Sequence, residues 1–407
     1  MSKPLKILKM KSKSILHTIC CLCILSSCLA CDKSSMGLSQ DPLVPPVGEN
    51  PGEEPTDPSD GGKTMVYEEG TNGYEVYRIP AIVKTEQGTL LAFAEARKLK
   101  SNGDSGDIDM VVKSSDDDGK TWSEMRMIWD EGQNTAGNPV PIVDKVTGKI
   151  HLLMTWNHGD DSWGELSSGT SIDTRKVYYT SSVDNGESWA APTEITASVK
   201  DERWGWYGTG PVHGIQVQKG EYEGRLVSPN YYTVQENGSI KTYSHVTYSD
   251  DNGVTWKSGN AVPDAGAGEC TVAELEDGTL LLNIRNGNEL ARKVSRSEDG
   301  GVTWSTPEIS YVLTDPHCQG SMVTSDTDPY RVFFANAAST ERTNITIKMS
   351  EDAGVSWGNQ KLIHAGPSAY SDLVMISDDE IGILYEGGEG RPYENIVFEN
   401  VVVSDLE

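Results

Sequence analysis

The stretch SDDDGKTW at residues 115–122 is the first of five copies of one eight-residue motif, Ser-x-Asp-x-Gly-x-Thr/Ser-Trp. In such a motif the Asp carboxylate accepts backbone N–H groups, Gly supplies a positive φ, and Trp packs beneath the turn. Each copy therefore predicts a tight turn in a β-hairpin, and five copies predict a repeated β-unit. The other copies occupy residues 182–189, 249–256, 297–304 and 350–357.

A shorter turn signal lies upstream of each motif and joins two apolar runs, as a β-hairpin does. A sixth turn of this kind follows the last motif, so the chain contains six such units. We predict an all-β fold, a six-bladed β-propeller of four-stranded antiparallel blades, because radial repetition protects strand edges. The segment near Tyr67 is expected to supply the outer strand of the sixth blade. The shorter turns are at residues 87–91, 147–150, 223–226, 277–280, 328–331 and 379–382.

Composition excludes several classes of protein. The 407 residues include 34 Lys and Arg against 61 Asp and Glu, a net charge of −27. So acidic a chain repels nucleic-acid phosphates, which excludes a general role in binding DNA or RNA. No apolar run after residue 40 is long enough to span a bilayer, which excludes a polytopic membrane protein. Only Cys270 and Cys318 follow residue 31, and two buried free thiols are favoured over a single disulfide.

The first 63 residues indicate export and tethering. Lysines followed by a short apolar stretch over residues 15–25 are typical of a signal peptide. The end of this stretch resembles a bacterial lipobox, in which Cys28 would be lipid-modified, with Cys31 as an alternative. Residues 29–63 are rich in Pro, Gly and acidic side chains and predict an extended, solvated tether. The expected domains are thus a signal peptide (1–28), a tether (29–63) and a propeller (64–407).

Candidate functional residues gather at the rim opposite the turns. If the first strand of each blade descends, both kinds of turn lie at the bottom, and the tops of the first two strands share the other face. Counting from the turns places four arginines, a tyrosine and three carboxylates at or beside these tops. Their recurrence in register predicts an anion-binding site. They are Arg78, Arg97, Asp104, Glu269, Arg285, Arg342, Tyr370 and Glu386.

Several longer segments resemble the bacterial exo-sialidases (neuraminidases), in which the eight-residue motif is called the Asp-box. The resemblance spans about residues 70–390, in the order of the family. It implies that Arg78, Arg285 and Arg342 hold the carboxylate of sialic acid, that Glu386 orients Arg78, and that Arg97 contacts the sugar near its 4-hydroxyl. The segments are YRIP (77–80), FAEAR (93–97), GDID (106–109), GTGPVHG (208–214), Glu269-Cys270 with Arg285, and AYSDL (369–373).

The same resemblance implies a catalytic set. Tyr370 and Glu269 match the nucleophile and its base, and Asp104 matches the general acid/base, although Asp107 in the same loop could exchange roles with it. Sialic acid carries a carboxylate on its anomeric carbon, so a carboxylate nucleophile would be repelled, whereas a neutral phenol would not. Sialidases are accordingly an exception to the two-carboxylate scheme of glycosidases. Because Asp104 must start protonated, a mildly acidic optimum is expected.

The function expected from the resemblance is hydrolysis of terminal sialic acids from glycoproteins, glycolipids and oligosaccharides, with retention and without a cofactor or metal. Two alternatives stay open: an intramolecular trans-sialidase with the same site, and a non-enzymatic Asp-box propeller that binds glycans or proteins. Asn138 and Trp156 are candidates for the N-acetyl pocket by position. We expect a monomer that meets the membrane only through a lipid anchor, on the periplasmic or outer face of the bacterial envelope.

Overall fold

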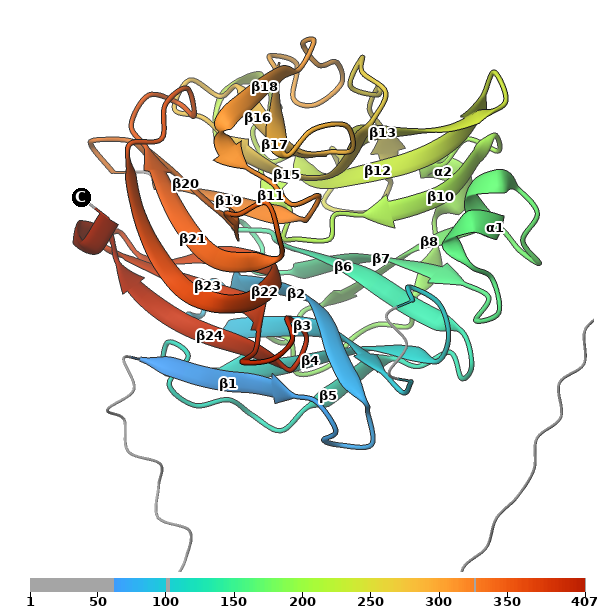
Figure 1. Ribbon diagram of the computed structural model, residues 1–407, viewed down its shortest axis with the longest axis horizontal. Coiled ribbons are helices and arrows are strands. Elements are labelled where there is room, and N and C mark those ends of the chain that lie inside the picture. The colour runs from blue at the N-terminus through green and yellow to red at the C-terminus, as the bar shows by residue number, and fades with distance from the viewer. Residues whose placement is uncertain (1–61, 100–102, 326, 407) are drawn as a thin grey trace, which may run out of the picture. The chain divides into compact units, whose positions relative to one another are not determined.

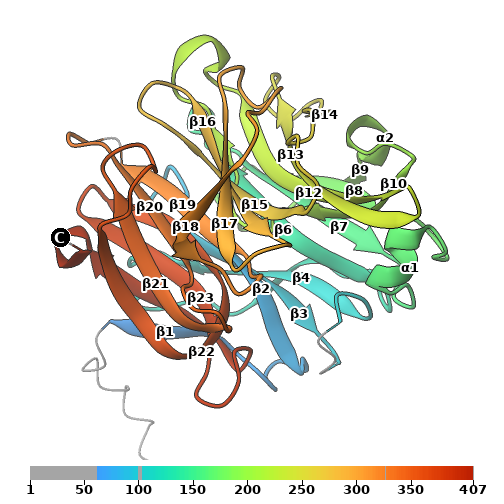
Figure 2. The same cartoon turned by 45° about the horizontal axis from the view of Figure 1, so that its top comes forward.

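The computed structural model describes residues 62–99, 103–325 and 327–406, and Figures 1 and 2 show their β-sheets packed around a common axis. The predicted signal peptide and nearly all of the tether lie outside these residues. Six inner strands contact one another in a ring, in the order β2, β6, β11, β15, β19, β22 and back to β2. The expected six-bladed propeller with four-stranded antiparallel blades is confirmed.

In each of the first three blades, consecutive strands of the chain are arranged from the centre of the ring outward. In the third blade the inner strand is interrupted, so that β10 and β11 both pair with β12. Two short helices, α1 (Trp163–Ser168) and α2 (Thr196–Val199), lie in the connections around β8 to β10, and a 3₁₀ turn, η1 (Gly220–Tyr222), precedes β12. The strands are β2 (Val76–Lys84), β3 (Leu90–Arg97), β4 (Ile108–Ser115), β5 (Arg126–Trp129); β6 (Thr135–Val143), β7 (Ile150–Asn157), β8 (Lys176–Ser182), β9 (Thr193–Glu194); β10 (Trp204–Thr209), β11 (Ile215–Gln216), β12 (Leu226–Glu236), β13 (Ser239–Ser249), β14 (Lys257–Ser258).

The last three blades repeat this pattern with one long shared strand. The first half of β22 pairs with β21 as the outer strand of the fifth blade, and its second half pairs with β23 as the inner strand of the sixth. A 3₁₀ turn, η2 (Val403–Leu406), follows the final strand. The strands are β15 (Ala267–Glu274), β16 (Leu280–Asn286), β17 (Ala291–Ser297), β18 (Glu308–Thr314); β19 (Gly320–Ser325), β20 (Arg331–Ala337), β21 (Thr343–Ser350), β22 (Asn359–Ser377); β23 (Glu380–Gly387), β24 (Asn395–Val402).

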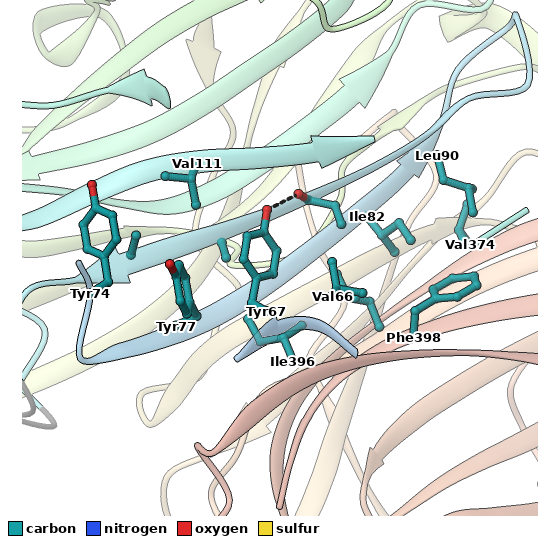
Figure 3. Close-up of a cluster of buried hydrophobic side chains, with 14 of the residues drawn as sticks. Val66, Tyr67, Tyr74, Tyr77, Ile82, Leu90, Val111, Val374, Ile396 and Phe398 are labelled. Carbon is teal, nitrogen blue, oxygen red and sulfur yellow. Dashed lines mark hydrogen bonds between the residues drawn. The ribbon is translucent and has the colours of Figure 1, made fainter. Parts of the chain in front are cut away.

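The sixth blade is completed by the first strand of the described chain, as predicted from the segment near Tyr67. Strand β1 (Lys63–Glu68) pairs antiparallel with β24, and Lys63 lies opposite Glu399. Figure 3 shows Tyr67 packed beside Tyr77 in the hydrophobic cluster between the sixth and first blades. The Tyr67 hydroxyl also donates to the Ala92 carbonyl at 2.8 Å. The ring is therefore closed by segments from both ends of the described chain.

The Asp-box turns have the expected chemistry and position. In the first copy Ser115 Oγ accepts the Gly119 N–H at 2.9 Å, and Asp117 accepts the Thr121 N–H at 2.9 Å. Gly119 has φ +86°, which favours glycine. Along β3 and β4, Ser115 lies opposite Leu90 at one end of the pair, whereas Arg97 lies at the other end. The Asp-boxes therefore stabilise the rim opposite the arginines.

Three further observations bear on the predictions from composition. Cys270 and Cys318 are buried free thiols, as predicted. No helix in the described ranges has the length and apolar character needed to cross a bilayer. The same ranges contain no cluster of three or more His, Cys, Asp or Glu side chains suited to holding a metal ion.

Candidate active site

The predicted residues converge on a single pocket at the tops of the inner strands. The pocket has a volume of about 370 Å³ and is open to solvent. Six of the eight candidate residues line the pocket wall, as predicted. A seventh, Glu386, lies immediately behind the wall and bonds to Arg78. Its lining is Arg78, Asp104, Trp163, Tyr231, Thr233, Thr242, Gly266, Gly268, Glu269, Arg285, Gly287, Arg342, Tyr370 and Tyr393. A second cavity, of about 190 Å³, opens at the other ends of the inner strands and has no arginine in its wall.

Tyr370 and Glu269 form a hydrogen-bonded pair at the pocket floor. The Tyr370 hydroxyl donates to Glu269 Oε1 at 2.5 Å, and Arg285 Nη1 donates to Glu269 Oε2 at 2.7 Å. The pKa of Tyr370 is raised well above its usual value, first by burial and then by the negative charge of Glu269, against the opposing charge of Arg285. The phenol is therefore neutral in the resting site, with a base already in contact with its proton.

Glu386 fixes the other wall of the pocket through four hydrogen bonds. Arg78 donates from Nε at 3.0 Å and from Nη2 at 3.1 Å, and the backbone N–H groups of Ile79 and Tyr370 donate at 2.8 and 3.1 Å. Ile79 has φ +60°, a strained conformation for a β-branched residue, within a bulge of β2. The fully buried Glu386 carboxylate thus holds together a guanidinium, a strained backbone and the strand that carries Tyr370.

We expect Glu386→Gln to lower the free energy of unfolding by about 3–5 kcal/mol, because the Arg78 guanidinium would stay buried without its counter-charge. Urea unfolding followed by tryptophan fluorescence measures the change. The matched control is Asp201→Asn, which removes a carboxylate from the exposed Arg203 pair and should leave the free energy nearly unchanged. Equal effects of the two substitutions would contradict this role for Glu386.

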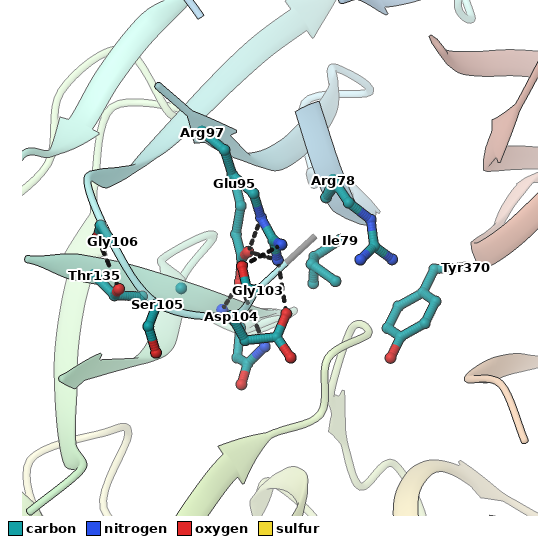
Figure 4. Close-up of polar contacts among 12 residues, drawn as sticks. Arg78, Ile79, Glu95, Arg97, Gly103, Asp104, Ser105, Gly106, Thr135 and Tyr370 are labelled. Atoms are coloured by element: carbon teal, nitrogen blue, oxygen red, sulfur yellow. Dashed lines mark hydrogen bonds and ion pairs between the residues drawn. The ribbon is translucent and has the colours of Figure 1, made fainter. Parts of the chain in front are cut away.

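Asp104 faces Tyr370 across the pocket, with the Arg78 guanidinium beside the gap (Figure 4). Its carboxylate accepts Arg97 Nη2 at 3.0 Å and is nearly half exposed. Burial alone would raise the pKa of Asp104, but the charges of Arg97, Arg78 and Arg175 outweigh it and hold the pKa below its usual value. Asp107 pairs with Lys98 at 3.1 Å and does not line the pocket, so Asp104 is the loop carboxylate that faces it.

The structure does not bring Arg97 to the pocket wall. Its guanidinium is buried and donates to Glu95, to the Gly103 carbonyl and to Asp104 (Figure 4). The contact with the sugar near its 4-hydroxyl therefore stays a prediction, and what the structure shows is a side chain that holds the Asp104 loop. Asn138 and Trp156, the N-acetyl candidates, do not line the pocket either.

Sequence reasoning missed Tyr393, in the connection between β23 and β24. The Arg78 guanidinium lies over its ring at 4.0 Å, and its hydroxyl accepts Arg342 Nη1 at 2.8 Å. One aromatic side chain thereby fixes two arginines from distant blades. Counting strand tops does not reach Tyr393, because this connection has no register with the turns; an aromatic residue shortly after the Glu386 strand was the available signal.

The family model described as the BNR repeat-like domain matches residues 88–385, which is more than half of the chain. The chain is 32% identical to a sialidase of Bacteroides fragilis over 83% of its length, and 32% identical to an exo-alpha-sialidase of Aspergillus fumigatus over 77%. It spans 64% of the first protein and 79% of the second. The chain belongs to the sialidase family.

Solved structures agree with this assignment. The chain superimposes on the Hadza microbial sialidase Hz136 with a TM-score of 0.76 and 29% identity, covering 85% of this chain and 69% of that one. A leech intramolecular trans-sialidase gives a TM-score of 0.74 at 18% identity, with 85% and 70% coverage, and supports the fold alone. Among the sequence relatives, a sialidase of Micromonospora viridifaciens is 33% identical over 80% of this chain, and the chain spans 52% of that protein's length.

Proposed function

We propose that the protein is an exo-α-sialidase, a glycoside hydrolase that releases terminal sialic acids from glycoconjugates with net retention. The observation that carries the proposal is the Tyr370–Glu269 hydrogen bond of 2.5 Å inside a pocket lined by three arginines. A phenol already bonded to a carboxylate base is suited to attack an anomeric carbon that bears a negative charge, where a carboxylate nucleophile is not. Membership of the sialidase family supports the same substrate class.

In the first step the arginines bind the substrate carboxylate by charge-assisted hydrogen bonds and place its anomeric carbon near Tyr370. The Tyr370 oxygen forms a bond to that carbon while Glu269 takes the phenolic proton. The bond to the leaving oxygen breaks, and Asp104 donates a proton to that oxygen. The result is a covalent sialyl-enzyme and a free glycan.

In the second step the ionised Asp104 removes a proton from a water molecule on the face vacated by the leaving group. The water oxygen bonds to the anomeric carbon, the bond to Tyr370 breaks, and Glu269 returns the proton to the phenolate. Two displacements at one carbon restore its configuration. Each group ends in its starting protonation state, so the cycle needs no cofactor.

The resting charge of Asp104 gives the expected pH dependence. Its lowered pKa means that the acid form is scarce in the free enzyme at neutral pH, so kcat/KM should fall as the pH rises through that pKa. A bound substrate carboxylate offsets the charge of Arg78 and so favours the proton on Asp104. The first effect places the optimum at acidic pH, and the second moves it back toward neutral pH in the complex.

The proposal is tested by incubating the protein with α2,3- and α2,6-sialyllactose and following the products by proton NMR. Release of free sialic acid, first as the α-anomer, is expected for a retaining hydrolase. An anhydro sugar as the main product would replace this proposal with intramolecular transfer. Binding of the oligosaccharides without any turnover would replace it with a glycan-binding propeller.

We further propose that the protein is a monomer that is exported and held at the bacterial envelope by lipid on Cys28. The proposal rests on the sequence of residues 1–63, in which the basic, apolar and tether segments follow in order. Metabolic labelling with a fatty acid, followed by envelope fractionation, tests it. Label in the wild type that is lost in Cys28→Ala is expected, and equal labelling of the two would reject it.

A further inference from the structure

Arg175, which directly precedes β8, is completely buried behind the pocket. Its side chain donates to the Tyr207 carbonyl at 2.8 Å, Asn138 Oδ1 at 2.8 Å, Thr155 Oγ1 at 2.7 Å and Asn157 Oδ1. Its guanidinium also lies 3.7 Å from the ring centre of Trp206, whose Nε1 donates to the pocket-lining Tyr231 hydroxyl. Every one of these partners is neutral.

Other buried arginines of the described chain have a carboxylate partner. Arg78 pairs with Glu386, Arg97 with Glu95, and Arg292 with Asp315. Arg175 makes no ion pair within the hydrogen bonds and salt bridges of the described residues. Burial of an uncompensated charge is costly, and it lowers the pKa of Arg175 to about 10. A fold that keeps such a charge buried needs it for more than packing.

A chain of hydrogen bonds leads from Arg175 to Asp104. Asn138, held by Arg175, donates its backbone N–H to Glu95 Oε1 at 2.8 Å. Glu95 in turn accepts Arg97 Nε at 3.0 Å, and Arg97 Nη2 reaches Asp104 at 3.0 Å (Figure 4). Asn138 has φ +54°, so its backbone conformation also depends on these contacts.

The formal charges along this series of hydrogen bonds show how Arg175 acts on Asp104. Arg175 and Arg97 carry two positive charges, and Glu95 and ionised Asp104 carry two negative charges, so the resting group is neutral. Protonation of Asp104 leaves one positive charge in excess. Arg175 therefore opposes protonation of the acid, in agreement with its contribution to the lowered pKa of Asp104.

We propose that Arg175 is a positioning residue for Asp104, which it holds ionised and bound to Arg97 in the empty site through its buried charge and this chain of bonds. The inference rests on the proposed role of Asp104 as the acid. Neighbours of Arg175 include Lys200, which donates to the Arg175 carbonyl at 2.7 Å. The titratable and charged groups around Asp104 are Arg97, Arg78 and Arg175, with Glu95, Tyr231, Glu269, Arg285 and Tyr370 beyond them.

Two substitutions test the charge in different ways. Arg175→Gln removes it, whereas Asn157→Asp keeps Arg175 and gives it a carboxylate, with loss of the bonds that Asn157 Nδ2 donates to Ser105 Oγ and to the His158 carbonyl. Each change favours the protonated acid, so the midpoint of the fall in kcat/KM with rising pH should move up by about 0.7 pH unit, a fivefold change in proton affinity. A residue needed only for packing would lower activity across the pH profile and leave this midpoint unchanged.

The matched control is Arg225→Gln, which removes a buried guanidinium that packs between Tyr222 and Tyr248 and pairs with Asp250, away from the pocket. It should lower stability and leave the midpoint of the pH profile at the wild-type value. If Arg175→Gln does not fold, Asn157→Asp decides, and a midpoint within about 0.3 pH unit of wild type would overturn the inference.

A second measurement separates this inference from the proposed function. Carbon-13 NMR titration of the Asp104 carboxyl in the free protein needs no turnover. Its midpoint should lie at higher pH in Asn157→Asp than in the wild type, and equal midpoints would overturn the inference. A wild-type protein that releases no sialic acid would overturn the proposed function alone, whatever the titration shows.

Discussion

Tyr370→Phe should lower kcat/KM for sialyllactose by about 10⁴-fold, the scale seen when one member of a coupled nucleophile system is removed from a hydrolase. The phenyl ring preserves packing against Arg78 and Arg342, so the fold and the bound carboxylate should be retained. In the proposed mechanism, what is lost is the oxygen that bonds to the anomeric carbon, together with the proton that it now donates to Glu269. Initial rates over a range of substrate concentrations measure the change, which should fall mainly on kcat.

The control for this substitution is Tyr232→Phe, which removes a hydroxyl from a tyrosine stacked on Trp204 outside the pocket. A fluorinated sialosyl fluoride, which slows breakdown of the intermediate, should add its mass to the peptide containing Tyr370 in the wild type and in this control. Labelling of a different residue, or a Tyr370→Phe protein within about tenfold of wild type, would mean that another group is the nucleophile.

The loss in kcat/KM caused by Asp104→Ala should depend strongly on the leaving group of the substrate. For sialyllactose, whose leaving alcohol must be protonated, we expect kcat/KM to fall by about 10²–10⁴-fold. For an aryl sialoside with an acidic phenol the first step needs no proton, so the loss in kcat/KM should be much smaller. Steady-state rates with the two substrates, measured side by side, give the comparison.

Asp107→Asn is the matched control, because Asp107 lies in the same loop but pairs with Lys98. It should keep the wild-type ratio between the two substrates. If Asp107→Asn showed the leaving-group dependence and Asp104→Ala did not, the two loop carboxylates would have exchanged roles. Uniform losses with both substrates would instead indicate that the loop serves binding alone.

Much of the fold was accessible from the sequence because its signals are local and repeated. An Asp-box fixes a turn through hydrogen bonds within eight residues, and six turns set the number of blades. The register of each strand then follows from its turn, which is why Arg78, Glu269 and Tyr370 could be assigned to strand tops on one face. The pairing of β1 with β24 was expected for a similar reason, since the sixth unit lacked an outer strand.

The direction of a side chain at a strand top was not accessible. Arg97 shares the rim with Arg78, yet it turns inward, because Glu95 two residues earlier and the Gly103 carbonyl both accept from it. Arg175 stands just before the third strand of its blade, and the sequence does not show that its side chain is buried among neutral partners. Such contacts depend on how several blades meet, and neither turn chemistry nor hydrophobic period encodes them.

The pairing of Lys63 with Glu399 determines when the ring can close during synthesis of the chain. Strand β1 leaves the ribosome long before β24, so β1 has no partner strand until β24 has been synthesised. Until then the growing chain exposes an open sheet edge, which invites pairing with other chains. The ring can therefore close only after the chain has been synthesised to about residue 402, and a chaperone that covers the open edge until then would prevent such pairing.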